Sequence, residues 1–115
     1  MTTVASMTAD LMDRWSTLGP EDRLRLFQAL PRDEADDFFL DLRAHDQAEL
    51  IRAMPTGERR LWLRLLAPDD AADLAQEFEP EQRGEILRDL DESTRSEVAG
   101  LLAYKEDVAG SFYRG

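Results

Sequence analysis

The sequence repeats a pattern of apolar residues every twelve residues, and this period limits the folds that the chain can adopt. Between residues 7 and 102 the chain divides evenly into eight blocks of twelve. Every block ends in a large apolar residue: Leu18, Leu30, Leu42, Met54, Leu66, Phe78, Leu90 and Leu102. The residues four and three positions before each of these are also apolar, except Arg14. The spacing i, i+1, i+4 places the three positions on one face of a helix.

Each block begins with residues that are typical of a helix N-terminus. The prolines of the chain all occupy the first or second position of a block: Pro20, Pro31, Pro55, Pro68 and Pro80. Proline is tolerated in the first turn of a helix, where its missing N–H has no partner to lose. Acidic residues follow in most blocks and complement the positive end of the helix dipole. We therefore predict one helix of about nine or ten residues per block, followed by a short turn.

Helices of this length are marginal alone in water, and each carries an apolar stripe too narrow to form a core with one neighbour. Stacking successive blocks solves both problems, which is the principle of a solenoid. Leucine occurs 17 times and valine and isoleucine together five times, which favours helix over sheet. We predict an all-α superhelix (solenoid), right- or left-handed, of about eight short helices, in which consecutive blocks form antiparallel pairs.

The period also sets the expected boundaries. We expect the superhelix to span residues 7–102, after a disordered N-terminal segment at residues 1–6. Arg14 interrupts the apolar column of the first block, so we expect a frayed or capping first helix. The pattern stops after Leu102, and residues 103–115 are expected to form a loop or linker towards a following domain.

Charge and composition exclude several classes of function. The formal net charge of −11 argues against binding to nucleic acid or to anionic lipid surfaces, which rests on Lys and Arg. The chain has no Cys, which excludes disulfides, thiolate metal sites and Cys nucleophiles, and suits a reducing compartment. No apolar run approaches the roughly 18 residues of a membrane span, and residues 1–13 lack the features of a signal peptide.

We do not expect an enzyme, because the sequence shows no set of residues arranged for catalysis. The single histidine, His45, lies near the start of a block and is interpreted as a surface residue. The sequence indicates neither a nucleophile that His45 could activate nor a residue that could orient it. The six glycines are scattered and form no phosphate-binding loop.

Aspartates at helical spacing are the remaining candidates for chemistry. Asp69 and Asp73 are spaced i, i+4, as are Asp33 and Asp37, and Asp37 and Asp41. One interpretation is a solvated polar face together with the preference of acids for helix starts. The other is a surface for a hard cation such as Mg²⁺, which takes oxygen ligands and usually one or two carboxylates. An i, i+4 pair would hold such an ion weakly unless a second acidic surface completed its shell.

The block at residues 55–66 differs from the others because it is basic. It carries Arg59, Arg60 and Arg64 against one acid, Glu58, with Trp62 between them. Trp62 is either a core residue flanked by solvated or ion-paired arginines, or part of a contact patch for an acidic partner. That candidate patch consists of Arg59, Trp62 and Arg64.

The end of the chain carries a motif that resembles a known family. Residues 101–110 (Leu-Leu-Ala-Tyr-Lys-Glu-Asp-Val-Ala-Gly) are similar to the closing motif of the N-terminal cytosolic domain of MgtE-type magnesium channels, Leu-x-x-Tyr-x-Glu-Asp-x-Ala-Gly. The Leu30-Pro31 pair and the run at residues 68–74 (Pro-Asp-Asp-Ala-Ala-Asp-Leu) are similar as well. The resemblance extends from about residue 18 to residue 110.

The resemblance implies a superhelix of short helices that precedes a pair of CBS domains and a membrane-embedded channel. It implies a cytoplasmic domain, at the cytosolic face of the inner membrane, that senses Mg²⁺ with carboxylates facing the CBS domains. By motif position, Asp69 and Asp73 match Mg²⁺ ligands of the family, and Asp37 matches a third. Mg²⁺ is then a weakly bound cofactor shared with a partner domain, and this chain itself does not insert into the membrane.

Two departures leave a competing function open. Residues 111–113 (Ser-Phe-Tyr) replace the small residue, Leu and Met that usually follow the motif, and the 115 residues hold no CBS or membrane segment. We expect either a domain excised from such a channel or a standalone form. The helical repeats are also similar to the middle domain of flagellar motor-switch proteins, so the alternative is a metal-independent scaffold for protein–protein interaction.

Overall fold

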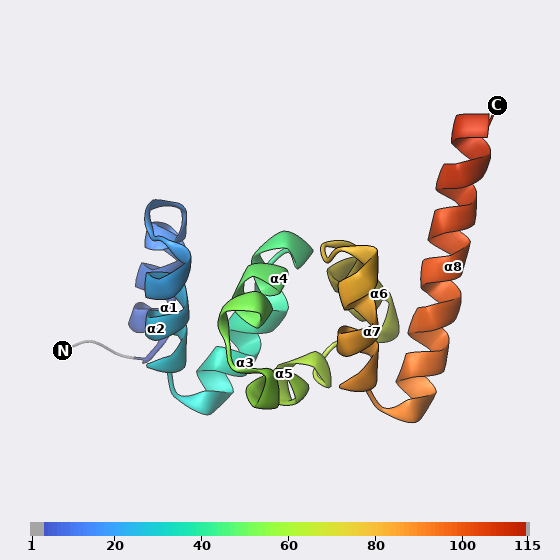
Figure 1. The fold of residues 1–115 in the computed structure, drawn as a ribbon. Helices are drawn as coiled ribbons and strands as arrows, with labels where there is room; N and C mark the ends of the chain where they lie inside the picture. The colour runs from blue at the N-terminus through green and yellow to red at the C-terminus, as the bar shows by residue number, and fades with distance from the viewer. Residues whose placement is uncertain (1–3, 115) are drawn as a thin grey trace.

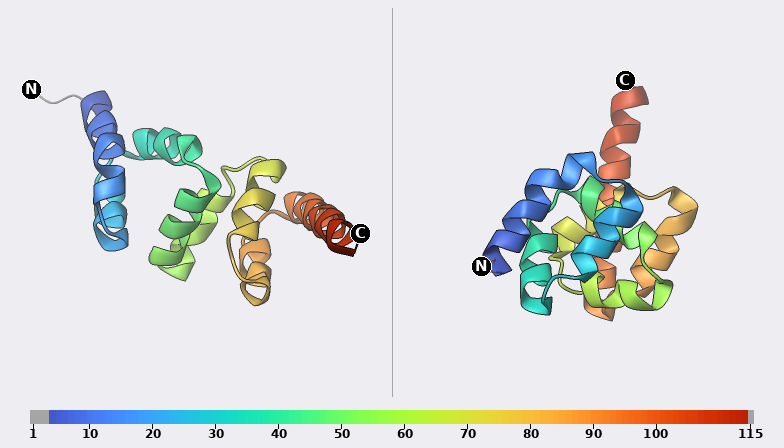
Figure 2. Two further views of the ribbon diagram at one scale, coloured as in Figure 1. Left: turned by 90° about the horizontal axis from the view of Figure 1, so that it is seen from above. Right: turned by 90° about the vertical axis from the view of Figure 1, so that its left-hand side faces the viewer.

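The computed structural model describes the backbone of residues 4–114 and the side chains of residues 8–105, and this part of the chain contains helices and turns but no strand. The elements are α1 (Val4–Arg14), the 3₁₀ helix η1 (Trp15–Thr17), α2 (Pro20–Gln28), α3 (Arg32–Asp41), α4 (Ala44–Ala53), α5 (Thr56–Leu63), α6 (Pro68–Gln76), α7 (Pro80–Arg88) and α8 (Glu92–Arg114). The helices follow one another along an elongated molecule of 57 × 31 × 20 Å, with α1 at one end and α8 at the other (Figures 1 and 2).

The positions of the helices confirm the twelve-residue period. From α2 to α8, every helix begins at the second residue of a block. Pro20, Pro68 and Pro80 are the first helical residues of their helices, whereas Pro31 and Pro55 are the N-cap residues. From α2 to α7 no N-cap side chain bonds to the helix start. Proline geometry and acidic first turns therefore define these starts in place of side-chain caps.

The apolar columns of the repeat form the core. The last residue of each block from Leu30 to Leu102 is buried, and Leu18 is half-buried. Five aromatic rings connect the N-terminal half: Trp15, Phe27, Phe38, Phe39 and Trp62. The ring of Phe27 lies 4.8 Å from that of Trp62, and the rings of Trp15 and Phe38 are 5.3 Å apart. These tilted pairs link blocks that are distant in the sequence.

The helices pack mainly against the next but one along the chain. α1 contacts α3, α2 contacts α4, α4 contacts α6, and α6 contacts α8 most extensively. The predicted pairing of consecutive blocks is seen at α7, which contacts both α6 and α8, whereas between α2 and α6 the contacts of alternate helices dominate. On α6, Ala71, Ala72 and Ala75 are fully buried. Small side chains on α6 let α4 and α8 approach it from two sides.

A second repeated feature, a side-chain hydrogen bond, joins five of the blocks to the block before them. Five residues at the fifth block position donate a side-chain hydrogen bond to a backbone carbonyl eight residues earlier: Arg23, Gln47, Arg59, Arg83 and Arg95. The acceptors are the carbonyls of Trp15, Phe39, Ile51, Ala75 and Leu87, at 2.8–3.2 Å. We call the five donors the clamp residues. They add a side-chain donor to carbonyls near helix C-termini, four of which also accept the backbone N–H three residues further on. The four arginines add a favourable positive charge there.

The first block differs from the pattern as its sequence suggested. Arg14 is exposed and pairs with Asp10 at 3.4 Å, while Leu11 and Trp15 provide the buried contact. The i, i+4 spacing of Leu11 and Trp15 thus replaces the interrupted column. α1 begins at Val4, so residues 4–6 of the segment expected to be disordered are helical, and residues 1–3 lie outside the described residues.

The C-terminal segment is helical where a loop or linker is expected. α8 continues without a break to Arg114, and its C-terminal part projects beyond the other helices (Figure 1). No proline follows Leu102, and an isolated glycine such as Gly110 costs a helix only about 1 kcal/mol. Loss of the apolar period therefore marks the end of the packing but not the end of the helix. Among the described residues, no helix has the length and apolarity needed to cross a bilayer.

Candidate cation-binding face

The carboxylates of α6 face outwards because the opposite face of the helix is packed. Ala71, Ala72, Leu74 and Ala75 are buried, whereas the aspartates at positions 69, 70 and 73 are exposed. The alternation follows from the helical period, which turns Asp69 and Asp73 to the same side, one turn apart. The acid-rich first turn of α6 also lies at the positive end of the helix dipole.

Asp69 borders an open groove between α6 and α8. The groove has a volume of about 430 Å³ and is lined by Pro68, Asp69, Glu97, Gly100 and Leu101. Two carboxylates, one from each helix, therefore share this groove. Oxygen ligands accessible to solvent fit a hydrated hard cation, which keeps several of its own waters.

Asp73 borders a different cavity, on the side of α6 that faces the turn between α3 and α4. This cavity of about 280 Å³ is lined by Leu40, Leu42, Arg43, Ala44, Gln47, Asp70 and Asp73. The Asp73 carboxylate also accepts a hydrogen bond from the Lys105 ammonium on α8. The two predicted ligands thus share one face of α6 but open onto separate hollows, and Asp73 already has a cationic partner.

Asp37 is exposed on α3, in a different element from the other two predicted ligands. Among the described side chains, a group of three potential metal ligands with their atoms within 4.8 Å of one another occurs at His45, Asp46 and Glu49. Asp37, Asp69 and Asp73 do not belong to such a group. The domain therefore presents these three carboxylates without gathering them into one ligand shell.

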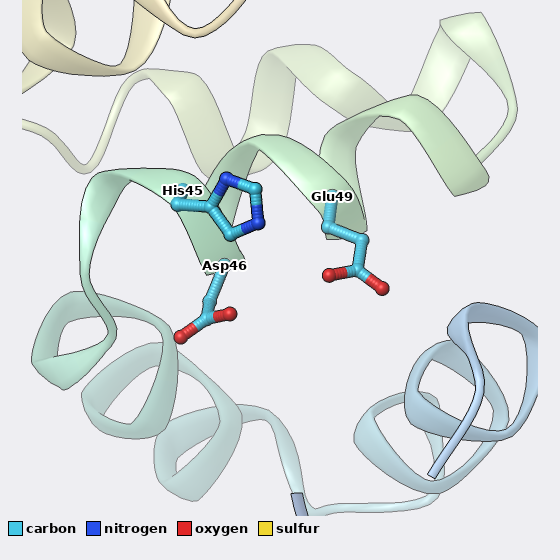
Figure 3. A group of neighbouring side chains, drawn as sticks. All are labelled: His45, Asp46 and Glu49. Atoms are coloured by element: carbon cyan, nitrogen blue, oxygen red, sulfur yellow. The ribbon is translucent and has the colours of Figure 1, made fainter. Parts of the chain in front are cut away.

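The group formed by His45, Asp46 and Glu49 was not singled out from the sequence, where His45 is interpreted as a surface residue. All three side chains come from α4 (Figure 3). Their spacing i, i+1, i+4 is the signal that could have suggested the group. A nitrogen and two carboxylate oxygens suit a borderline ion such as Zn²⁺ better than Mg²⁺.

Each member of this group already has a partner. Glu49 pairs with the Arg23 guanidinium at 2.7 Å, and Asp46 lies 3.9 Å from that of Arg43. Nδ1 of His45, an exposed side chain, lies 3.1 Å from a carboxylate oxygen of Glu77. The contacts of Glu49 and His45 link α4 to α2 and to the C-cap residue of α6, which gives the group a structural role.

The three residues of the predicted basic patch differ in how deeply they are buried. Trp62 is buried in the aromatic core, as in the first of the two interpretations of this block. Arg59 is half-buried, donates to the carbonyl of Ile51 at 2.9 Å and lies 3.8 Å from Glu85. Arg64 is exposed and pairs with Asp91 at 3.3 Å. Of the predicted patch, Arg64 and the outer part of Arg59 therefore lie at the surface.

Comparison with known proteins supports the resemblance carried by the closing motif. Residues 6–107 match the family model described as the MgtE intracellular N domain. The chain is also 36% identical over 104 residues to the protein named magnesium transporter MgtE of Thermus thermophilus. That match covers 88% of this chain and 23% of the relative, so the chain spans about a quarter of the relative's length. The match to the family model over most of the chain shows that this protein belongs to the MgtE intracellular N domain family.

Proposed function

We propose that this chain is a cytosolic, non-enzymatic regulatory domain that senses Mg²⁺ for a magnesium channel or transporter. The observation that carries the proposal is the exposed acidic face of α6 in a member of this family. Asp69 and Asp73, with Asp37 on α3, supply the oxygen ligands that Mg²⁺ prefers. The domain then works at the cytosolic face of the inner membrane, next to the channel.

The geometry supports a site shared with a second domain. Since the three aspartates do not converge, each offers an ion only part of a ligand shell. A CBS-type domain pair of the same polypeptide or assembly, with its own acidic surface, would complete the shell. At low Mg²⁺ the two acidic surfaces repel each other, and the net charge of −11 on this chain strengthens that repulsion. Mg²⁺ entering between them offsets the repulsion and favours the docked, closed state.

The steepness with which docking responds to Mg²⁺ concentration depends on the number of ions that bind between the two domains. A ligand shifts an equilibrium only by its differential affinity for the two states. A complete switch from 1:99 to 99:1 requires a total preference of about 10⁴-fold. Ions that each favour the docked state by about tenfold multiply their effects, so a few weak sites suffice.

The experiment is a Mg²⁺ titration of the 115-residue chain at constant ionic strength, followed by amide NMR. We expect saturable shift changes centred on residues 68–74 that weaken strongly in the Asp69→Asn/Asp73→Asn variant. The matched control is Glu21→Gln/Asp22→Asn, which removes two first-turn charges of α2 and leaves α6 intact. Identical shift changes in wild type and the α6 variant would refute the site assignment.

A metal-independent scaffold is the second candidate function, and one observation favours it. An open groove of about 550 Å³ runs beside Trp62 and is bordered by Phe27, Leu30 and Leu61. Leu61 is 53% exposed, which is unusual for a large apolar side chain in this molecule. The Arg32 guanidinium lies over the Trp62 ring at 4.5 Å and lines the same groove. Such a scaffold would hold its partner equally well when EDTA has removed divalent ions.

A further inference from the structure

Lys105 contacts one of the proposed ligands. It is the single lysine of the chain and occupies the variable position of the closing motif, between Tyr104 and Glu106. Its ammonium donates a hydrogen bond to the Asp73 carboxylate, across the contact between α8 and α6. The Lys105 side chain is 31% exposed and that of Asp73 is 50% exposed, so water and ions still reach the pair.

The contact is anchored on both sides. α6 and α8 form the most extensive helix–helix contact of the domain, and Val98 and Leu102 bury α8 in the core. Lys105 follows Leu102 by three residues, so the packed part of α8 positions the start of its side chain. Asp70 and Arg43 line the cavity beside Asp73, so the carboxylate has a further charge of each sign nearby.

The ammonium and a divalent cation compete for the same carboxylate. With Lys105 on one oxygen of Asp73, Mg²⁺ approaching the other oxygen meets a positive charge a few ångströms away. Two like charges at that distance repel each other measurably even in water, and more at a partly covered site. Binding of Mg²⁺ therefore favours release of Lys105 from Asp73.

We infer that Lys105 is a built-in counter-ion of the Asp73 site, which Mg²⁺ must displace, and which sets the affinity of that site. This inference rests on the proposed function. Lys105 neutralises Asp73 at low Mg²⁺ and raises the concentration at which the ion binds.

The first test compares the Mg²⁺ affinity of the 115-residue chain with that of Lys105→Met, which keeps the length of the side chain and removes its charge. We expect Lys105→Met to bind Mg²⁺ roughly two- to fivefold more tightly at low ionic strength, the range of a surface ion pair. Lys105→Arg keeps the charge and stays within about twofold of wild type. Arg60→Met is the matched control, because it removes one exposed positive charge from α5.

The second readout uses the uniqueness of the lysine. Lysine labelled with ¹³C at Cε gives a single side-chain signal, whose shift reports the Asp73 contact directly. We expect this signal to move towards that of a free lysine in Asp73→Asn without Mg²⁺, and in wild type as Mg²⁺ is added. A signal that neither change moves would overturn the inference.

The outcomes separate this inference from the proposed function. If Lys105→Met binds Mg²⁺ like wild type, or gains no more than Arg60→Met, the counter-ion role is wrong. The proposed function still stands in that case, provided that Asp69→Asn/Asp73→Asn weakens binding. If that double variant leaves binding unchanged, the site itself is wrong, and the role of Lys105 fails with it.

Discussion

Replacing Arg23 by methionine should lower the free energy of unfolding by about 3 kcal/mol, because this one clamp residue makes three contacts. Its Nε donates to the carbonyl of Trp15 at 2.8 Å, and its Nη1 to the Glu49 carboxylate at 2.7 Å. Its guanidinium also lies 5.1 Å from the centre of the Trp15 ring. The side chains of Arg23 and Glu49 are 14% and 21% exposed, so water replaces these contacts poorly.

The magnitude follows from the separate contacts. A hydrogen bond from a charged donor contributes about 1.5–3 kcal/mol, and a cation–π contact in a partly exposed position about 0.5–1 kcal/mol. Breaking a fully buried ion pair costs about 3–5 kcal/mol, and the partial exposure of this pair reduces that to about 1 kcal/mol. Contacts made by one group are not additive, which brings the expected total to about 3 kcal/mol.

The assay is urea unfolding followed by tryptophan fluorescence, with the two-state slope compared between variants. Arg25→Met is the matched control on the same helix. Arg25 is 69% exposed and pairs with Asp22 at 3.0 Å, so its loss should cost less than about 0.5 kcal/mol. If the two variants unfold at the same urea concentration, the clamp residues do not stabilise the repeat as the structure indicates.

Two further predictions concern packing and helix propensity. Ala72→Leu should cost about 1–3 kcal/mol, because Ala72 is fully buried on α6, whereas Ala99→Leu on the exposed face of α8 should be nearly neutral. Gly84→Ala should stabilise the domain by about 0.5–1 kcal/mol, because a Cβ there meets nothing within 4 Å on α7. Gly19→Ala, at the N-cap of α2, should give no such gain. Urea midpoints test both pairs, and equal shifts within a pair would contradict the reasoning.

The regular part of the fold could be predicted from the sequence because it depends on local patterns. Proline and acidic residues at block starts determine where helices begin, and Pro20 and Pro68 are indeed first helical residues. The apolar columns identify the core because only one face of each short helix can be buried. Trp62 shows the limit of this reasoning, because its spacing in the sequence allows both a core and a surface role. The structure decides between them by placing its ring beside that of Phe27.

The remaining features depend on tertiary arrangement, which spacing alone does not reveal. Arg23 and Arg59 are polar residues in the pattern, and their acceptor carbonyls come within reach only when successive helices turn back on each other. The helical continuation of α8 differs from the expected linker because the apolar period that ends at Leu102 reports packing against other helices, not the helical state itself. The partners of Asp73 and His45 lie on other helices, at Lys105 and Glu77, and no local motif connects them.

The two aspartates that the family motif suggested as ligands lie on the surface, where a hydrated cation could reach them. Asp69 and Asp73 are both exposed on α6, and the packing of the alanine face explains why. Their separation into two hollows was not predictable, since it depends on how α8 and the α3–α4 turn pack around α6. This separation favours ions that bridge two domains over an ion held by this domain alone.

The most direct test of the central claim measures docking of this chain to a CBS-type domain pair of the same polypeptide or assembly, by sedimentation velocity at constant ionic strength. The account predicts association in millimolar Mg²⁺ that is lost on addition of EDTA and in Asp69→Asn/Asp73→Asn. Glu21→Gln/Asp22→Asn should dock like wild type. Association that survives EDTA, or that the α6 substitutions leave unchanged, would contradict Mg²⁺ sensing and favour the metal-independent scaffold.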